Sequence, residues 1–153
     1  MRGSDQMKKI MFICTGNICR SSMAEVILRK LAEEKGKEVE SYSSGIFAQN
    51  GEQATQYSVE ALKEIGIDLA NHKATNVKDA KLDEMDLILC MTKDHKQMIL
   101  QHYPDLKEKV YTLEEYTNGI QEDVKDPWGY DIEIYRKCSR QIYQAIEKLV
   151  DKI

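Results

Sequence analysis

The chain has 153 residues, of which 42% are hydrophobic and 31% charged, and this balance predicts one globular domain with a real core. The net charge of −4 without a basic block argues against nucleic acid as a partner. No apolar run approaches the roughly 20 residues of a membrane span, and no secretory signal opens the chain. We therefore expect no membrane partner and a cytoplasmic location.

Strands and helices are predicted to alternate along the chain. Residues 1–6 (MRGSDQ) are expected to be a flexible extension or a cloning remnant, and the domain is expected to span 7–153. In chain order, the patterns predict a strand over 8–13, a helix over 21–35, a strand over 39–43, a helix over 54–65, a strand over 86–91, a helix from 93 to about 102, a strand over 109–113 and a helix over 132–153. Val59, Leu62 and Ile65 are expected to form the buried face of the second helix.

This alternation predicts an α/β fold in a single domain, with a parallel sheet and helices on both of its faces. In such folds, ligands bind at the carboxyl ends of the strands, beside a helix N-terminus. The segment 14–21 (CTGNICRS) lies at this position, between the first strand and the first helix.

The segment 14–21 has the composition of a phosphate-binding loop, because inward backbone N–H groups and a helix N-terminus can surround an anion. Gly16 is expected to allow close approach and a positive φ, and Asn17 tolerates the left-handed region. Arg20 can bind two phosphate oxygens with its planar guanidinium. Thiols at a helix N-terminus near an arginine ionise more readily than free cysteine, so Cys14 is expected to attack as a thiolate.

The Cys-x5-Arg spacing alone is a weak signal for a phosphate site. The alternative without a function is that Cys14 is a buried thiol at a strand end and Arg20 a solvated helix residue. The strand before it, the glycine within it and the amphipathic helix beyond it favour the phosphate site. The four cysteines form no CxxC pair and the histidines lack HExxH spacing, so we expect free thiols, no metal and no cofactor.

The sequence resembles the low-molecular-weight protein-tyrosine phosphatases, in the bacterial branch that also contains protein-arginine phosphatases. The resemblance extends from Met7 to the C-terminus and rests on CTGNICRS followed by MAE, SSG at 43–45, HKA at 72–74 and DPWG at 126–129. It implies a four-stranded parallel sheet, a phosphocysteine intermediate and phosphorylated proteins as partners.

The resemblance also implies roles for single residues. Cys14 would be the nucleophile, Arg20 the clamp on the transition state and Asp126 the general acid, although DPWG by itself predicts only a turn. The phosphate-binding loop would comprise Thr15, Gly16, Asn17, Ile18, Cys19 and Ser21, with Ser43 and His72 holding its shape and with Ile18 and Trp128 as pocket walls. Ser22 stands where the family usually has proline, which should cost rigidity and leave the chemistry intact.

The remaining cysteines and histidines have ordinary interpretations, except for Cys19. Mild peroxide is expected to join Cys14 to Cys19 reversibly, because a nearby thiol can trap a sulfenic acid; alternatively, Cys19 only fills space. Cys90 is expected in the core and Cys138 on a helix face. His95 and His102 lie among charged residues and are expected to be solvated.

Three functional alternatives remain beside a tyrosine phosphatase. An arsenate reductase would need further, closely spaced cysteines, and a phosphate-binding module would not need a nucleophile, an arginine and an acid together. The third alternative is a protein-arginine phosphatase, since GIFAQNGEQA, MTKDHKQ and YTLEEY resemble that branch. Tyrosine-directed members read NIC in the loop, where we expect NTC in arginine-directed ones, so Ile18 predicts a preference for phosphotyrosine.

Overall fold

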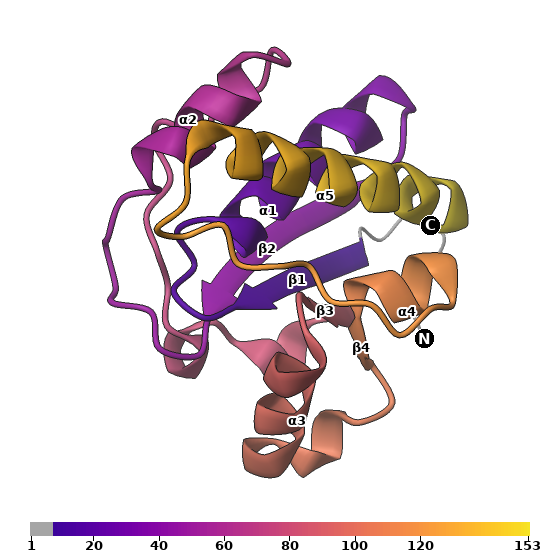
Figure 1. Ribbon diagram of the computed structural model, residues 1–153. Helices are drawn as coiled ribbons and strands as arrows, with labels where there is room; N and C mark the ends of the chain where they lie inside the picture. The colour runs from indigo at the N-terminus through magenta and orange to yellow at the C-terminus, as the bar shows by residue number, and fades with distance from the viewer. Residues whose placement is uncertain (1–7) are drawn as a thin grey trace.

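The computed structural model describes residues 8–153, so the extension expected at residues 1–6 lies outside the described residues. Four parallel strands form one sheet in the order β2-β1-β3-β4 (Figure 1). They are β1 (Lys8–Cys14), β2 (Val39–Gly45), β3 (Leu87–Cys90) and β4 (Val110–Thr112). The predicted strands and the predicted α/β class are confirmed.

Within the described residues, five α-helices accompany the sheet. They are α1 (Arg20–Glu34), α2 (Gln56–Lys63), α3 (Lys93–His102), α4 (Leu113–Asn118) and α5 (Ile132–Lys152), with short 3₁₀ turns at Val77–Asp79, Leu82–Glu84 and Pro104–Leu106. Figure 1 shows α1 and α5 side by side on one face of the sheet and α3 on the other. None of the helices within residues 8–153 has the length and apolar character needed to cross a membrane.

Alternate residues of β1 face two separate cores. Ile10 and Phe12 pack against α1 and α5, whereas Met11 and Ile13 pack with Ile99 of α3 on the opposite face. All of these side chains are at most 2% exposed. Burial on both faces is typical of a parallel sheet, and each such side chain contributes roughly 1.5–3 kcal/mol. The sheet is therefore a rigid base for the loops at its carboxyl edge.

Two helix predictions differ from the structure. Ile65 is 46% exposed, contrary to prediction, because α2 ends at Lys63 and the chain turns at Gly66 with a φ of +77°. The residue that packs inward after this turn is Ile67. The short helix α4 was not predicted, although Thr112 and Glu115 form a capping box at its start.

Candidate active site

The loop between β1 and α1 packs against the end of β2. The register pairs Cys14 with Gly45, and the backbone N–H of Phe47 donates to the carbonyl of Thr15 at 2.9 Å. A Cβ at position 45 would lie 2.6 Å from the Thr15 carbonyl oxygen and 2.8 Å from the Asn17 nitrogen. Both atoms belong to the backbone and cannot swing away, so this contact requires glycine.

The sharp turn of the loop is made by Asn17 and not by Gly16. Asn17 has a φ of +58°, as predicted, whereas Gly16 is not in the left-handed region, contrary to prediction. A Cβ at Gly16 would meet only the side chain of Ile18, at 3.6 Å. The left-handed backbone conformation is therefore adopted by Asn17, whose side chain can be fixed by hydrogen bonds.

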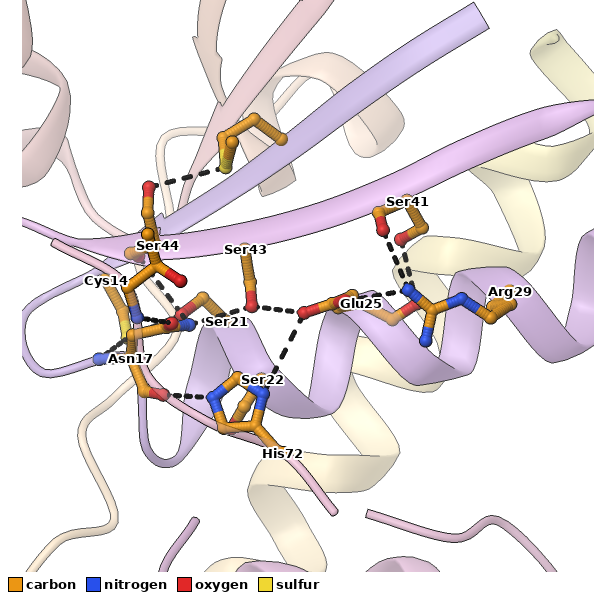
Figure 2. Close-up of polar contacts among 12 residues, drawn as sticks. Cys14, Asn17, Ser21, Ser22, Glu25, Arg29, Ser41, Ser43, Ser44 and His72 are labelled. Atoms are coloured by element: carbon orange, nitrogen blue, oxygen red, sulfur yellow. Dashed lines mark hydrogen bonds and ion pairs between the residues drawn. The ribbon is translucent and has the colours of Figure 1, made fainter. Parts of the chain in front are cut away.

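The Cys14 thiol lies at the bottom of the loop with two partners. Its Sγ is 2.9 Å from the Ser21 hydroxyl and accepts the Asn17 backbone N–H at 3.3 Å (Figure 2). Cys14 itself is only 3% exposed. Donors at these positions stabilise negative charge on sulfur, so the loop is suited to hold a thiolate.

The side chain of Asn17 connects the elements beneath the loop. Its Nδ2 donates to Ser21 Oγ and to Ser43 Oγ, both at 2.8 Å, and its Oδ1 accepts the Thr75 N–H at 2.9 Å. These three hydrogen bonds use both protons of the Asn17 side-chain amide. They also distinguish its nitrogen from its oxygen, because the nitrogen faces two acceptors and the oxygen faces a donor. Because Ser21 accepts from Asn17, its own proton can point at the Cys14 sulfur, at 2.9 Å, or at the Ser44 carbonyl, at 3.4 Å. The structure brings these residues together beneath the thiol, and the roles that the resemblance implies for them stay predictions.

His72 and Glu25 complete this buried network (Figure 2). His72 Nε2 lies 2.6 Å from the Asn17 carbonyl, which can only accept, so Nε2 carries a proton. Ser43 donates to Glu25, whose carboxylate also pairs with Arg29 at 2.7 Å. Glu25 was not predicted to contribute. Two features of the sequence could have indicated Glu25. It belongs to the MAE motif, and it lies one helical turn after Ser21 on the same face of α1.

The Arg20 guanidinium is buried beside the pocket and is partly unpaired. Nη1 donates to the Val124 carbonyl at 2.9 Å, and Nη2 lies 3.4 Å from Thr15 Oγ1 and 3.6 Å from Asp126 Oδ2. Nε is buried and has no hydrogen-bond partner among the described residues. A buried cation with an unused donor is suited to bind an anion that enters from the pocket.

The pocket above the thiol has a volume of about 250 Å³ and contains most of the predicted site residues. It is lined by Cys14, Thr15, Gly16, Ile18, Cys19, Arg20, Asp126 and Trp128. Asp126 Oδ1 accepts the Trp128 N–H at 3.1 Å in a tight turn, and about half of the Asp126 side chain is exposed. Asn17, Ser21, Ser43 and His72 lie below the pocket, behind the loop.

The Cys19 thiol, although Cys19 lines the pocket, has its hydrogen-bond partners at the start of α2 and in the first turn of α5. Its Sγ lies 3.4 Å from the Tyr135 hydroxyl and 3.6 Å from the Thr55 hydroxyl, and burial raises the pKa of the Cys19 thiol. Cys14 and Cys19 are both free, and the disulfide between them stays a prediction. Cys90 is in the core as predicted, and Cys138 is buried on the inner face of α5.

His95 is buried, contrary to the prediction that it is solvated. It is 6% exposed, and its Nε2 lies 2.9 Å from Thr15 Oγ1. Thr92 caps α3 and accepts the His95 N–H, so the first turn of α3 directs this side chain to the carboxyl edge of the sheet. Burial and the nearby Arg20 charge lower the pKa of His95 to about 4, so the imidazole is neutral.

Gly45→Ala is expected to impair the site without unfolding the chain. The added methyl group must push the Thr15–Asn17 backbone aside, and a displacement of about 1 Å in a catalytic group can cost roughly 100-fold in rate. We expect kcat/KM to fall by at least about tenfold, with a loss of stability of roughly 1–3 kcal/mol. Steady-state kinetics together with thermal unfolding test this. Unchanged kcat/KM would show that the loop does not depend on this contact.

Comparison with known proteins gives one consistent family. Residues 9–153 match the family model described as low molecular weight phosphotyrosine protein phosphatase. A protein-arginine-phosphatase of Bacillus subtilis (strain 168) is 39% identical over 144 residues, which cover 94% of this chain and 95% of the relative.

Solved structures agree with this match. A low molecular weight protein tyrosine phosphatase from T. tengcongensis has a TM-score of 0.91 and 38% identity, covering 95% of this chain and 99% of the other. A mutant of the YwlE arginine phosphatase, with cysteine replaced by serine and a phosphorylated active site serine, has a TM-score of 0.91 and 38% identity and covers 94% of both chains. The chain thus belongs to the low molecular weight phosphotyrosine protein phosphatase family, and the predicted enzyme class, a cysteine-dependent protein phosphatase, is confirmed.

Proposed function

We propose that this chain hydrolyses phosphotyrosine in cytoplasmic proteins through a phosphocysteine intermediate, with Cys14 as nucleophile, Arg20 as phosphate clamp and Asp126 as general acid. The observation that carries the proposal is the pocket of about 250 Å³, which has the Cys14 thiol at its floor and Arg20 and Asp126 in its wall. In the related YwlE mutant, a phosphorylated active site serine supports a phosphoryl group held covalently by the enzyme.

In the first step, the Cys14 thiolate attacks phosphorus, so that a P–S bond forms and the bond to the leaving oxygen breaks. Asp126 gives its proton to that oxygen, and the tyrosine leaves as a neutral phenol. Arg20 donates to the phosphoryl oxygens, on which negative charge is spread in the transition state. The Arg20 guanidinium is already buried beside the pocket with an N–H at Nε left unused by residues 8–153, so this donor is in place before the substrate arrives.

In the second step, water attacks the phosphocysteine and the P–S bond breaks. Asp126, now a carboxylate, accepts a proton from the water, and inorganic phosphate leaves. The Ser21 hydroxyl and the Asn17 N–H donate to sulfur as it departs with the electron pair. The same two donors that stabilise the attacking thiolate therefore also make it a better leaving group.

Substrate preference is assigned to phosphotyrosine on the basis of the pocket wall. Ile18 lines the pocket with an apolar branched side chain, and Trp128, 64% exposed, lines it as well. Together they form a slot suited to an aromatic ring. Phosphoarginine instead brings guanidinium N–H groups, and each one left unpaired in a closed pocket costs roughly 1–3 kcal/mol. A second candidate, phosphoarginine hydrolysis, is favoured by the 39% identity to the Bacillus subtilis arginine phosphatase.

The specificity experiment compares kcat/KM for a phosphotyrosine peptide and a phosphoarginine peptide, on the wild type, Ile18→Thr and Ile18→Val. We expect the wild type to prefer phosphotyrosine. Ile18→Thr should lower the tyrosine-to-arginine ratio by about 5- to 150-fold, which corresponds to roughly 1–3 kcal/mol.

Ile18→Val is the matched control, because valine has the shape of threonine without its hydroxyl. It should leave the ratio close to that of the wild type. A fall of the ratio in both variants would assign the effect to volume. A wild type that hydrolyses phosphoarginine more efficiently would show that the second candidate is the function.

A further inference from the structure

A second hydrogen-bond chain, separate from the Asn17 network, has a buried residue at each end. It runs from the Arg20 guanidinium through the Thr15 hydroxyl to the imidazole of His95. Thr15 Oγ1 lies 3.4 Å from Arg20 Nη2 and 2.9 Å from His95 Nε2. Thr15 lines the pocket, whereas His95 is buried beneath it.

The direction of the first hydrogen bond in this chain is fixed by chemistry. A guanidinium can only donate, so the Thr15 oxygen must present a lone pair to Arg20. A free hydroxyl rotates about its C–O bond and can turn its own proton toward the cation. In the tautomer with Nε2 unprotonated, the imidazole accepts the hydroxyl proton at 2.9 Å, and both lone pairs of the Thr15 oxygen stay available to the cation. The hydroxyl is thereby kept as an acceptor for Arg20.

His95 is well placed to hold the Thr15 hydroxyl, because it belongs to a regular element of the fold. His95 lies in the first turn of α3, and Thr15 directly follows β1. The other two partners of Arg20, the Val124 carbonyl and the Asp126 carboxylate, both lie in the segment between α4 and α5, which contains no helix or strand. Thr15 is thus the partner of Arg20 that is tied to two regular elements.

We propose that His95 is a positioning residue: through the Thr15 hydroxyl, it holds the Arg20 guanidinium in the orientation that binds the phosphoryl group. Two-pronged binding of phosphate by arginine requires this orientation to be set within about 10–20°. This inference rests on the proposed role of Arg20 as the phosphate clamp. It predicts that His95 affects phosphate affinity without touching the phosphate.

The experiment measures the dissociation constant of inorganic phosphate by titration calorimetry, and kcat and KM for a phosphotyrosine peptide, in the full chain. Thr15→Val removes the hydroxyl, and His95→Leu removes the imidazole. Each variant should weaken phosphate binding and raise KM by about three- to tenfold, since a hydrogen bond to a charged group is lost. The double variant should be no worse than Thr15→Val alone, because His95 acts through Thr15.

His95→Gln is the matched control, since its terminal amide reaches about as far as Nε2 and the amide oxygen can accept the Thr15 proton. It should recover most of the phosphate affinity. If His95 only fills the core, His95→Leu will reduce the active fraction and kcat, while KM and phosphate affinity stay as in the wild type. That result overturns the inference, as do losses that multiply in the double variant.

Two features keep the test decisive. Thr15 is exposed, so Thr15→Val reports on the hydroxyl even if His95→Leu does not fold. Phosphate binding can be measured without turnover, so the role of His95 and the proposed hydrolysis of phosphotyrosine can be refuted independently. A wild type that binds phosphate without hydrolysing phosphopeptides would refute the proposed function, whereas unchanged phosphate affinity in Thr15→Val would refute only the role of His95.

Discussion

Cys14→Ser is expected to abolish measurable turnover while inorganic phosphate still binds. Serine keeps the size and position of the thiol, so the loop, Arg20 and the Asn17 N–H remain in place for an anion. The hydroxyl of serine stays protonated near neutral pH and is a weaker nucleophile than a thiolate, and a serine that does become phosphorylated, as in the YwlE mutant, holds the phosphoryl group through an oxygen that leaves less readily than sulfur. The measurement is kcat on a phosphotyrosine peptide, together with phosphate binding by titration calorimetry.

Cys138→Ser is the matched control for the loss of a thiol. Cys138 is also buried, on α5, and its Sγ lies 3.8 Å from the Lys125 carbonyl, which a serine hydroxyl can use as an acceptor. We expect this variant to retain turnover. Appreciable activity in Cys14→Ser, or inactivity confined to Cys138→Ser, would mean that Cys14 is not the nucleophile.

The sheet was predictable because its signals are local. The strand that became β3 is a run of apolar residues buried on both faces, and Thr92 begins α3 as a helix cap should. The prediction was wrong where tertiary position decides the outcome. Ile65 fits the apolar spacing of α2 but lies beyond its end, and α4, with six residues, is too short for a helical period to show.

The site was predictable to different degrees for the same physical reason. Cys14 and Arg20 lie on one contiguous loop, so their spacing carries the signal. Ser43, His72 and Asp126 reach the loop from distant segments, and only the family resemblance placed them. A contact over such a sequence separation leaves no local pattern.

His95 was misassigned for a related reason. Its neighbours Lys93 and Asp94 are charged, which is typical of a solvated face, and the sequence does not show that the first turn of α3 points its third residue inward. The hydrogen bond to Thr15 spans 80 positions along the chain. Only the fold shows that His95 lies behind Thr15 and Arg20.

Asp126→Asn is expected to lower kcat by roughly 10²–10⁴-fold for phenyl phosphates with poor leaving groups. The amide cannot supply the proton that the departing oxygen needs, but its oxygen can still accept the Trp128 N–H and preserve the turn. The loss should shrink steadily as the leaving group becomes more acidic, because a stable phenolate departs without protonation. A series of substituted phenyl phosphates, from phenyl to para-nitrophenyl, measures this dependence.

Asp123→Asn is the control that distinguishes loss of the proton donor Asp126 from displacement of the segment that carries it. Asp123 lies in the same segment but directs its carboxylate to the Lys93 N–H at 2.9 Å, outside the pocket lining. We expect only a modest change in kcat for this variant, of equal size for every leaving group, because any effect must come from altered packing of the segment. If Asp126→Asn also showed an equal loss across the series, displacement of the loop would explain its defect. A loss that grows with the basicity of the leaving group in Asp126→Asn alone identifies this carboxyl as the proton donor.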